Sequence, residues 1–309
     1  MQMINLGVLK LRKSNFTQSI FHSVFHLLGF FCVFILFSCK SVPQGNFVIP
    51  LDLLDGENAF YLSVPSSADP ELVSKIIQNN ASITKKDADT AVTRIQKIYL
   101  GMTSNKKVYT YQAAVECNIP ASFVPKLFSK KNGFSKYQYI SYNTKKYDLY
   151  DSSKVKLSFP DSSTLVLGRN IENMLDTYTL YSNPSSDNIL IGNPYIEDEF
   201  YDFLYSAKDS IRFYANKPQS FLSLLTGSNL DLKLSYVTGE MSTDPDSSTQ
   251  YILDLEFEFA KERYVKTGKA LLTLALGLTK SQSEMISPTK LKISGIKLNK
   301  SQLYKMITF

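Results

Sequence analysis

The sequence has few of the residues that carry most enzyme chemistry. Its 309 residues include two histidines, three cysteines and no tryptophan. His22, His26 and Cys32 all lie within the first 38 residues. A chain without that segment has no histidine, which excludes Ser-His-Asp and Cys-His catalysis and histidine-ligated zinc. Carboxylate chemistry is then the main enzymatic option.

A strong excess of charge of one sign is also missing. The whole chain has 34 basic and 28 acidic side chains, a net charge of +6. Three of the bases lie in the first 38 residues, so the rest of the chain has 31 bases against 28 acids, a net charge of +3. Its lysine pairs are short and scattered. Because a nucleic-acid binder carries a concentrated basic patch, we expect no nucleic-acid partner.

What the sequence does have is a long apolar run near its beginning. Lys10, Arg12 and Lys13 precede the segment 19–38, which has no acid or base apart from the two histidines. A basic segment, an apolar run and small residues at its end are typical of an export signal. The run approaches the roughly 20 residues that span a bilayer. A cleaved signal and a retained transmembrane anchor are both compatible with it.

The run ends in "LFSC", residues 36–39, which resembles the lipobox of bacterial lipoproteins. Phe37 stands where a small residue is usual, a departure that the relaxed lipoboxes of spirochaetes tolerate. The resemblance implies cleavage before Cys39, a diacylglycerol on its sulfur and an acyl chain such as palmitate on the new terminus. Two or three such chains hold a protein stably in a bilayer.

We therefore expect a lipoprotein signal peptide at 1–38, lipidation of Cys39 and a tether at 39–50. The protein would lie in the bacterial cell envelope, lipid-anchored to the membrane on its periplasmic or surface side, with the bilayer as its partner. A retained transmembrane anchor and a plain secretory signal are the alternatives. With Cys39 acylated, Cys117 is the one free thiol, so no intramolecular disulfide forms.

The rest of the chain alternates between strand and helix patterns. Both halves run strand, helix, strand, strand, helix, strand and a closing helix. The alternating strands "YTYQAAVECNIP" (109–120) and "YILDLEFEFA" (251–260) occupy the same position in this order. This order predicts an α+β fold of two tandem ferredoxin-like (β-α-β-β-α-β) modules, with antiparallel sheets and helices on one face. The modules would cover 51–182 and 183–309, the second with a bridging helix after Pro194.

Alternation along two of the strands also predicts which side chains are buried. Val115 and Cys117 fall on the apolar face of the first strand, and Leu255 and Phe257 on that of the second. Glu256 falls on the opposite face. In this register Cys117 is a small core residue rather than a nucleophile.

One acidic cluster is the candidate site, formed by Glu197, Asp198, Glu199 and Asp202. Four close carboxylates suit a cation or a catalytic pair. The favoured interpretation is structural, because acids in the first turn of a helix meet the positive end of its dipole. We therefore assign no catalytic residue and no metal site, and no glycine-rich phosphate loop indicates a cofactor.

Three functions follow from these observations. The first is a non-enzymatic envelope lipoprotein that binds a partner or holds an assembly together, with an envelope protein or a glycan as partner. The second is a carboxylate-based hydrolase of glycan or peptidoglycan, which depends on the acidic cluster. The third is a lipoprotein that binds a solute or lipid in a cleft between the modules.

Overall fold

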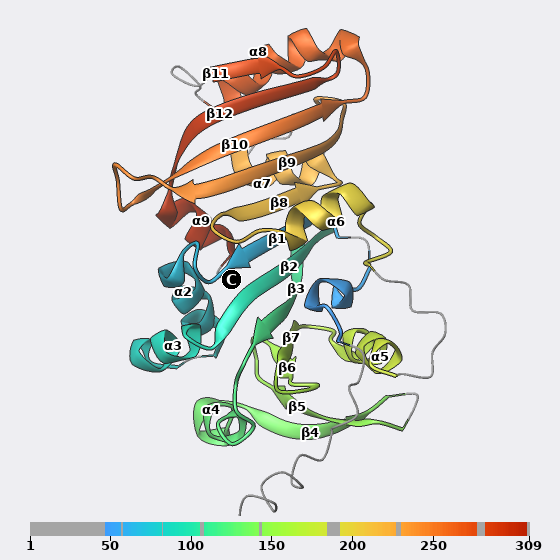
Figure 1. Cartoon of the computed structure of the whole chain (residues 1–309), viewed down its shortest axis with the longest axis vertical. Helices are drawn as coiled ribbons and strands as arrows, with labels where there is room; N and C mark the ends of the chain where they lie inside the picture. Colours follow the sequence, from blue (N-terminus) through green and yellow to red (C-terminus); the bar gives the residue numbers. More distant parts are fainter. Residues whose placement is uncertain are drawn as a thin grey trace, which may run out of the picture. The chain divides into compact units, whose positions relative to one another are not determined.

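Twelve strands form one antiparallel sheet in the computed structural model, which describes residues 47–56, 58–81, 83–105, 108–141, 144–183, 192–226, 230–276 and 282–307. The strand order is β11-β12-β10-β9-β8-β1-β2-β3-β7-β6-β5-β4 (Figure 1). No helix within these ranges is both long enough and apolar enough to span a membrane. Cys39 and the predicted signal peptide lie outside the described residues.

The first half of the chain supplies seven of the strands. Its elements are η1 (Pro50–Leu53), β1 (Phe60–Pro65), α2 (Pro70–Ala81), α3 (Lys85–Val92), β2 (Ile95–Asn105), β3 (Val108–Cys117), α4 (Val124–Leu127), η2 (Lys130–Asn132), β4 (Ser135–Ile140), β5 (Lys146–Asp151), β6 (Lys156–Ser158), β7 (Thr164–Gly168) and α5 (Glu172–Tyr181).

The second half adds the other five. Its elements are α6 (Asp198–Tyr205), β8 (Ile211–Ala215), α7 (Pro218–Thr226), β9 (Leu234–Thr243), β10 (Gln250–Phe259), η3 (Glu262–Tyr264), α8 (Val265–Ala275), β11 (Gln282–Met285), β12 (Lys290–Asn299) and α9 (Lys300–Ile307). The predicted bridging helix after Pro194 is α6.

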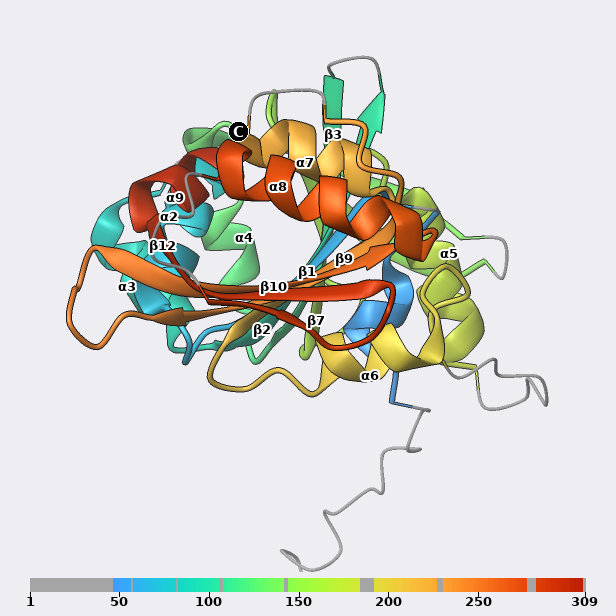
Figure 2. The ribbon, with the colours of Figure 1, turned by 90° about the horizontal axis from the view of Figure 1, so that it is seen from above.

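Helices cover both faces of the sheet, whereas we expected them on one (Figure 2). Successive strand residues point to opposite faces, so Leu62 of β1 joins one core and Tyr61 joins the other. The larger core holds side chains from α2, α4, α7, α8 and α9. The smaller core holds side chains from η1, α5 and α6. The mixed α and β composition is confirmed, and the one-sided layering is wrong.

The tandem ferredoxin-like arrangement is also wrong. In a β-α-β unit the two strands that flank the helix run parallel. Here β1 and β2 flank α2 and α3 but pair antiparallel, with Leu62 opposite Leu100. β1 ends at Pro65, which lies opposite Lys97 near the start of β2. The helices between them therefore carry the chain out and back instead of across the sheet.

The two predicted modules share the single sheet. β1 pairs with β8, with Tyr61 opposite Tyr214, and residues 46–309 form one compact unit. A boundary near residue 182 therefore separates no sheets. The predicted tether is shorter than 39–50, because Val48 and Pro50 are already buried in the folded unit.

The predicted register of the two alternating strands is confirmed. Val115 and Cys117 are buried on β3, and Leu255 and Phe257 are buried on β10. Glu256 lies on the opposite face, opposite Lys292 of β12.

The buried thiol of Cys117 leads to a first prediction. Burial raises the pKa of this thiol to about 12, so at pH 8 it is protonated and unreactive. We expect a disulfide reagent to label native protein only at the rate of unfolding, and a reducing agent to leave the melting temperature unchanged. Fast labelling of native protein, or a drop in melting temperature on reduction, would contradict this.

Candidate functional site

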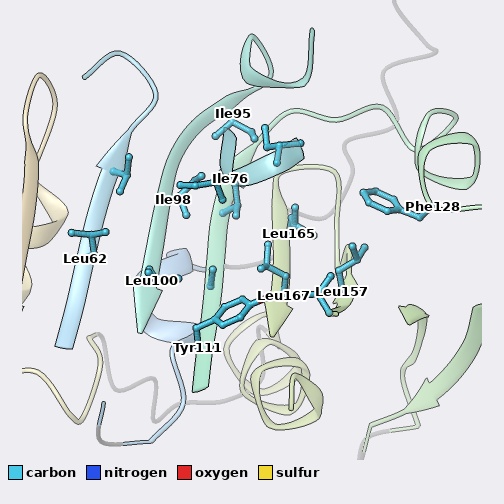
Figure 3. A pocket seen from close by; sticks show the side chains of 15 residues that line it. Leu62, Ile76, Ile95, Ile98, Leu100, Tyr111, Phe128, Leu157, Leu165 and Leu167 are labelled. Atoms are coloured by element: carbon cyan, nitrogen blue, oxygen red, sulfur yellow. The ribbon is translucent and has the colours of Figure 1, made fainter. Parts of the chain in front are cut away.

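An apolar cavity of about 80 Å³ lies on the α2 side of the sheet. Its floor is made by β1, β2, β3, β6 and β7, and its cover includes α2 and the end of α4 (Figure 3). The lining residues are Leu62, Val64, Ile76, Ile77, Ile95, Ile98, Leu100, Tyr111, Ala113, Val115, Phe128, Val155, Leu157, Leu165 and Leu167.

The sequence of α2 explains how this helix comes to cover the cavity. Asp69 caps it by accepting a hydrogen bond of 2.9 Å from the Leu72 backbone nitrogen, and Pro70 is its first residue. Both residue types favour a helix start. Leu72, Ile76 and Ile77 then recur at helical spacing, which directs one apolar face toward the sheet. Ile76 and Ile77 line the cavity.

The floor has room because one of its side chains is small. Tyr111, Ala113 and Val115 alternate along β3 on the cavity face, and Ala113 reaches least far from the sheet. On the α4 side of the cavity the Phe128 ring is held in place by its neighbours. Its centre lies 5.2 Å from the centre of the Phe134 ring and 5.8 Å from that of the Tyr150 ring.

The cavity is suited to an apolar guest. Tyr111 supplies the one polar side-chain group among the lining residues, and it lies beside Leu167 (Figure 3). Burial raises the pKa of its hydroxyl, and the nearby Arg169 offsets part of this rise, so the phenol is neutral. Cavities lined by Leu, Ile and Phe stay dry and accept apolar molecules. This one has room for a few carbon atoms.

The acidic cluster lies elsewhere, at the start of α6. Glu197, Asp198, Glu199 and Asp202 are all exposed, and Asp198 and Glu199 occupy the first turn. This placement agrees with the favoured structural interpretation. No group of three or more His, Cys, Asp or Glu side chains suited to a metal occurs among the residues that the structure describes.

Two of the four acids do border a second, open groove of about 710 Å³ on the other side of the sheet. Glu199 and Asp202 form part of its α6 wall, and Glu240 and Glu256 lie on its strand floor. Two floor acids form ion pairs, Glu240 with Arg212 at 3.2 Å and Glu256 with Lys292 at 4.0 Å. The third floor acid, Asp254, accepts a hydrogen bond of 2.9 Å from the Gly295 backbone nitrogen. The cluster as a whole therefore does not converge on one site.

The cavity was not among the sequence predictions. Side-chain alternation correctly placed Val115 on a buried face of β3, and the helical spacing in α2 marks a second apolar face. Nothing in those patterns shows that the faces leave a space between them, because such a space depends on several segments at once.

Comparison with known proteins places the chain in a family. A family model described as "Outer membrane-associated lipoprotein TP0453" matches residues 45–304. The structure of crystal form I of TP0453 is similar, with a TM-score of 0.64 and 16% identity over 85% of this chain and 97% of that chain. Crystal form III has a TM-score of 0.62 and 18% identity over 85% and 98%.

At these identities the likeness to the solved structures shows the fold. No curated protein sequence matches this chain. The family match confirms the prediction of a membrane-associated lipoprotein of the cell envelope. The chain belongs to the outer membrane-associated lipoprotein TP0453 family.

Proposed function

We propose that this lipoprotein is non-enzymatic, is anchored through acylated Cys39, and takes up an apolar group such as a lipid acyl chain in the cavity beneath α2. The observation that carries the proposal is the lining of that cavity. Fourteen of its fifteen side chains are hydrocarbon, and the remaining one, Tyr111, ends in a neutral hydroxyl. Such a lining favours binding over chemistry, because it offers no charged acid, base or nucleophile.

The anchor supports this role because it keeps the cavity close to a source of acyl chains. The nine residue steps from Cys39 to Val48, the first buried residue of the folded unit, span at most about 30 Å when extended. Moving a CH₂ group from water into the cavity gains about 0.8 kcal/mol. Moving it from the bilayer gains little, since both surroundings are apolar, so exchange with the membrane would be reversible.

Filling the cavity tests the proposal. Residues 46–309 form one compact unit with its own cores, so a chain that begins at Lys40 is expected to fold without its lipid. We expect it to bind the neutral fluorescent probe N-phenyl-1-naphthylamine saturably; because this probe is larger than the closed cavity of about 80 Å³, its binding requires α2 to move outward. Ala113→Leu should weaken binding at least tenfold, because its extra carbons occupy much of a cavity of about 80 Å³.

Ala270→Leu is the matched control, because it adds the same side chain on the exposed face of α8 and should leave binding unchanged. A circular dichroism melt checks folding, since overpacking costs about 1–3 kcal/mol. Equal binding by wild type and Ala113→Leu, or no saturable binding by wild type, would refute the proposed ligand site.

A further inference from the structure

The first turn of α2 is tied to the last helix of the chain by a buried ion pair. The Lys300 Nζ of α9 lies 2.8 Å from the Asp69 Oδ2, and the two side chains are 12% and 2% exposed. The Tyr251 hydroxyl of β10 donates a 2.5 Å hydrogen bond to the same oxygen. We call Asp69, Lys300 and Tyr251 the Asp69 cluster. It joins three elements that are far apart in the sequence.

The carboxylate of this cluster is ionised. Burial alone would raise the pKa of Asp69, but hydrogen bonds from Lys300, Tyr251 and the Leu72 backbone nitrogen outweigh it and hold the pKa below its usual range. Burial and the bond to Asp69 raise the pKa of Tyr251, which therefore stays a neutral donor. Asp69 therefore keeps its negative charge near neutral pH.

A second contact joins the same two helices one turn further along α2. The Lys75 Nζ lies 3.8 Å from the centre of the Tyr304 ring of α9, within range of a cation–π interaction. Lys75 also pairs with Glu71 at 3.0 Å. The next two residues of α2, Ile76 and Ile77, line the apolar cavity. The contacts to α9 therefore hold the part of α2 that covers it.

We propose that the Asp69 cluster regulates access to this cavity. The inference rests on the proposed function, because a cavity of about 80 Å³ admits only the end of an acyl chain while α2 is in place. With the ion pair formed, α2 is fixed against the sheet. When the pair separates, the first turn of α2 moves outward and the cavity lengthens. Local openings of this kind depend on the contacts that hold the segment.

Asp69→Asn is the most direct test. Asparagine still caps the helix and still accepts from Tyr251, but it removes the charge that pairs with Lys300. Lys300→Met removes the other partner and serves if Asp69→Asn fails to fold. Asp209→Asn is the matched control, because it makes the same change at an exposed acid that lies outside α2, α9 and the Asp69 cluster.

Two readouts on the chain that begins at Lys40 decide the matter. Hydrogen exchange followed by mass spectrometry should show peptides from 70–81 exchanging at least tenfold faster in Asp69→Asn, with 265–275 of α8 unchanged. Stopped-flow uptake of N-phenyl-1-naphthylamine should accelerate at least tenfold. Asp209→Asn should match wild type in both.

Unchanged exchange in α2, equal acceleration in α8, or faster exchange without faster uptake would each overturn the regulatory role. If wild type takes up no probe, the proposed function fails. Exchange then still shows whether the Asp69 cluster holds α2, so the two failures are distinguishable.

Discussion

Replacing Leu255 with aspartate is expected to unfold the folded part of the chain. Leu255 is 0% exposed in β10, which pairs with β9 on one side and β12 on the other. Losing its burial costs about 1.5–3 kcal/mol, and an unpaired buried carboxylate adds several more. Because a domain is stable by only about 5–15 kcal/mol, the substitution removes most or all of that margin.

The single sheet makes this loss global. β8 and β1 join the strands of both halves into one array, so unfolding around β10 removes a pairing edge from the first half as well. Circular dichroism at 25 °C should show loss of strand signal throughout. Glu256→Gln, one residue along on the opposite face, should shift stability by about 1 kcal/mol or less. A cooperative melt of Leu255→Asp within a few degrees of wild type would contradict the register.

Replacing Cys39 with alanine is expected to release the protein from the membrane. Without the thiol no diacylglycerol attaches, and two or three acyl chains account for the difference between stable anchoring and none. Metabolic labelling with a fatty-acid probe should give a labelled band for wild type and none for Cys39→Ala. In detergent phase partitioning, labelled wild type should enter the detergent phase and unlabelled Cys39→Ala should stay in the aqueous phase.

Cys32→Ala is the control, because Cys32 lies inside the predicted signal peptide and should keep both label and partitioning. If Cys39→Ala stays labelled, the lipidation site is elsewhere. If it loses the label, Cys39 is the lipidation site, and any protein that stays in the membrane is then held by the apolar run. Retention of the label would overturn the assignment of Cys39.

Side-chain alternation predicted which face each strand buries but not which strands pair. The pattern from Tyr251 to Phe259 identifies the core face of β10 because its period matches the pleat. The pairing partner depends on the path of the connection. α2 and α3 together return the chain to the end of the sheet that it left, and this path cannot be read from the apolar spacing of either helix alone.

At the candidate site too, local sequence signals indicated where helices begin but not which distant residues come into contact. Pro194 and the acids that follow indicated a helix start, and α6 begins at Asp198. Asp69 and Pro70 are likewise residue types that favour a helix start, and α2 begins at Pro70. The role of Asp69 in pairing with Lys300, 231 residues later, could not be predicted, because a long-range contact of a buried carboxylate depends on the assembled sheet.

Native mass spectrometry of the mature lipoprotein, purified from its own membranes, tests the central claim most directly. If the cavity takes up an acyl chain, wild type should carry a bound lipid at a ratio of one to one. Ala113→Leu should carry far less, and Ala270→Leu should match wild type. Wild type without bound lipid, or Ala113→Leu with as much as wild type, would contradict the account.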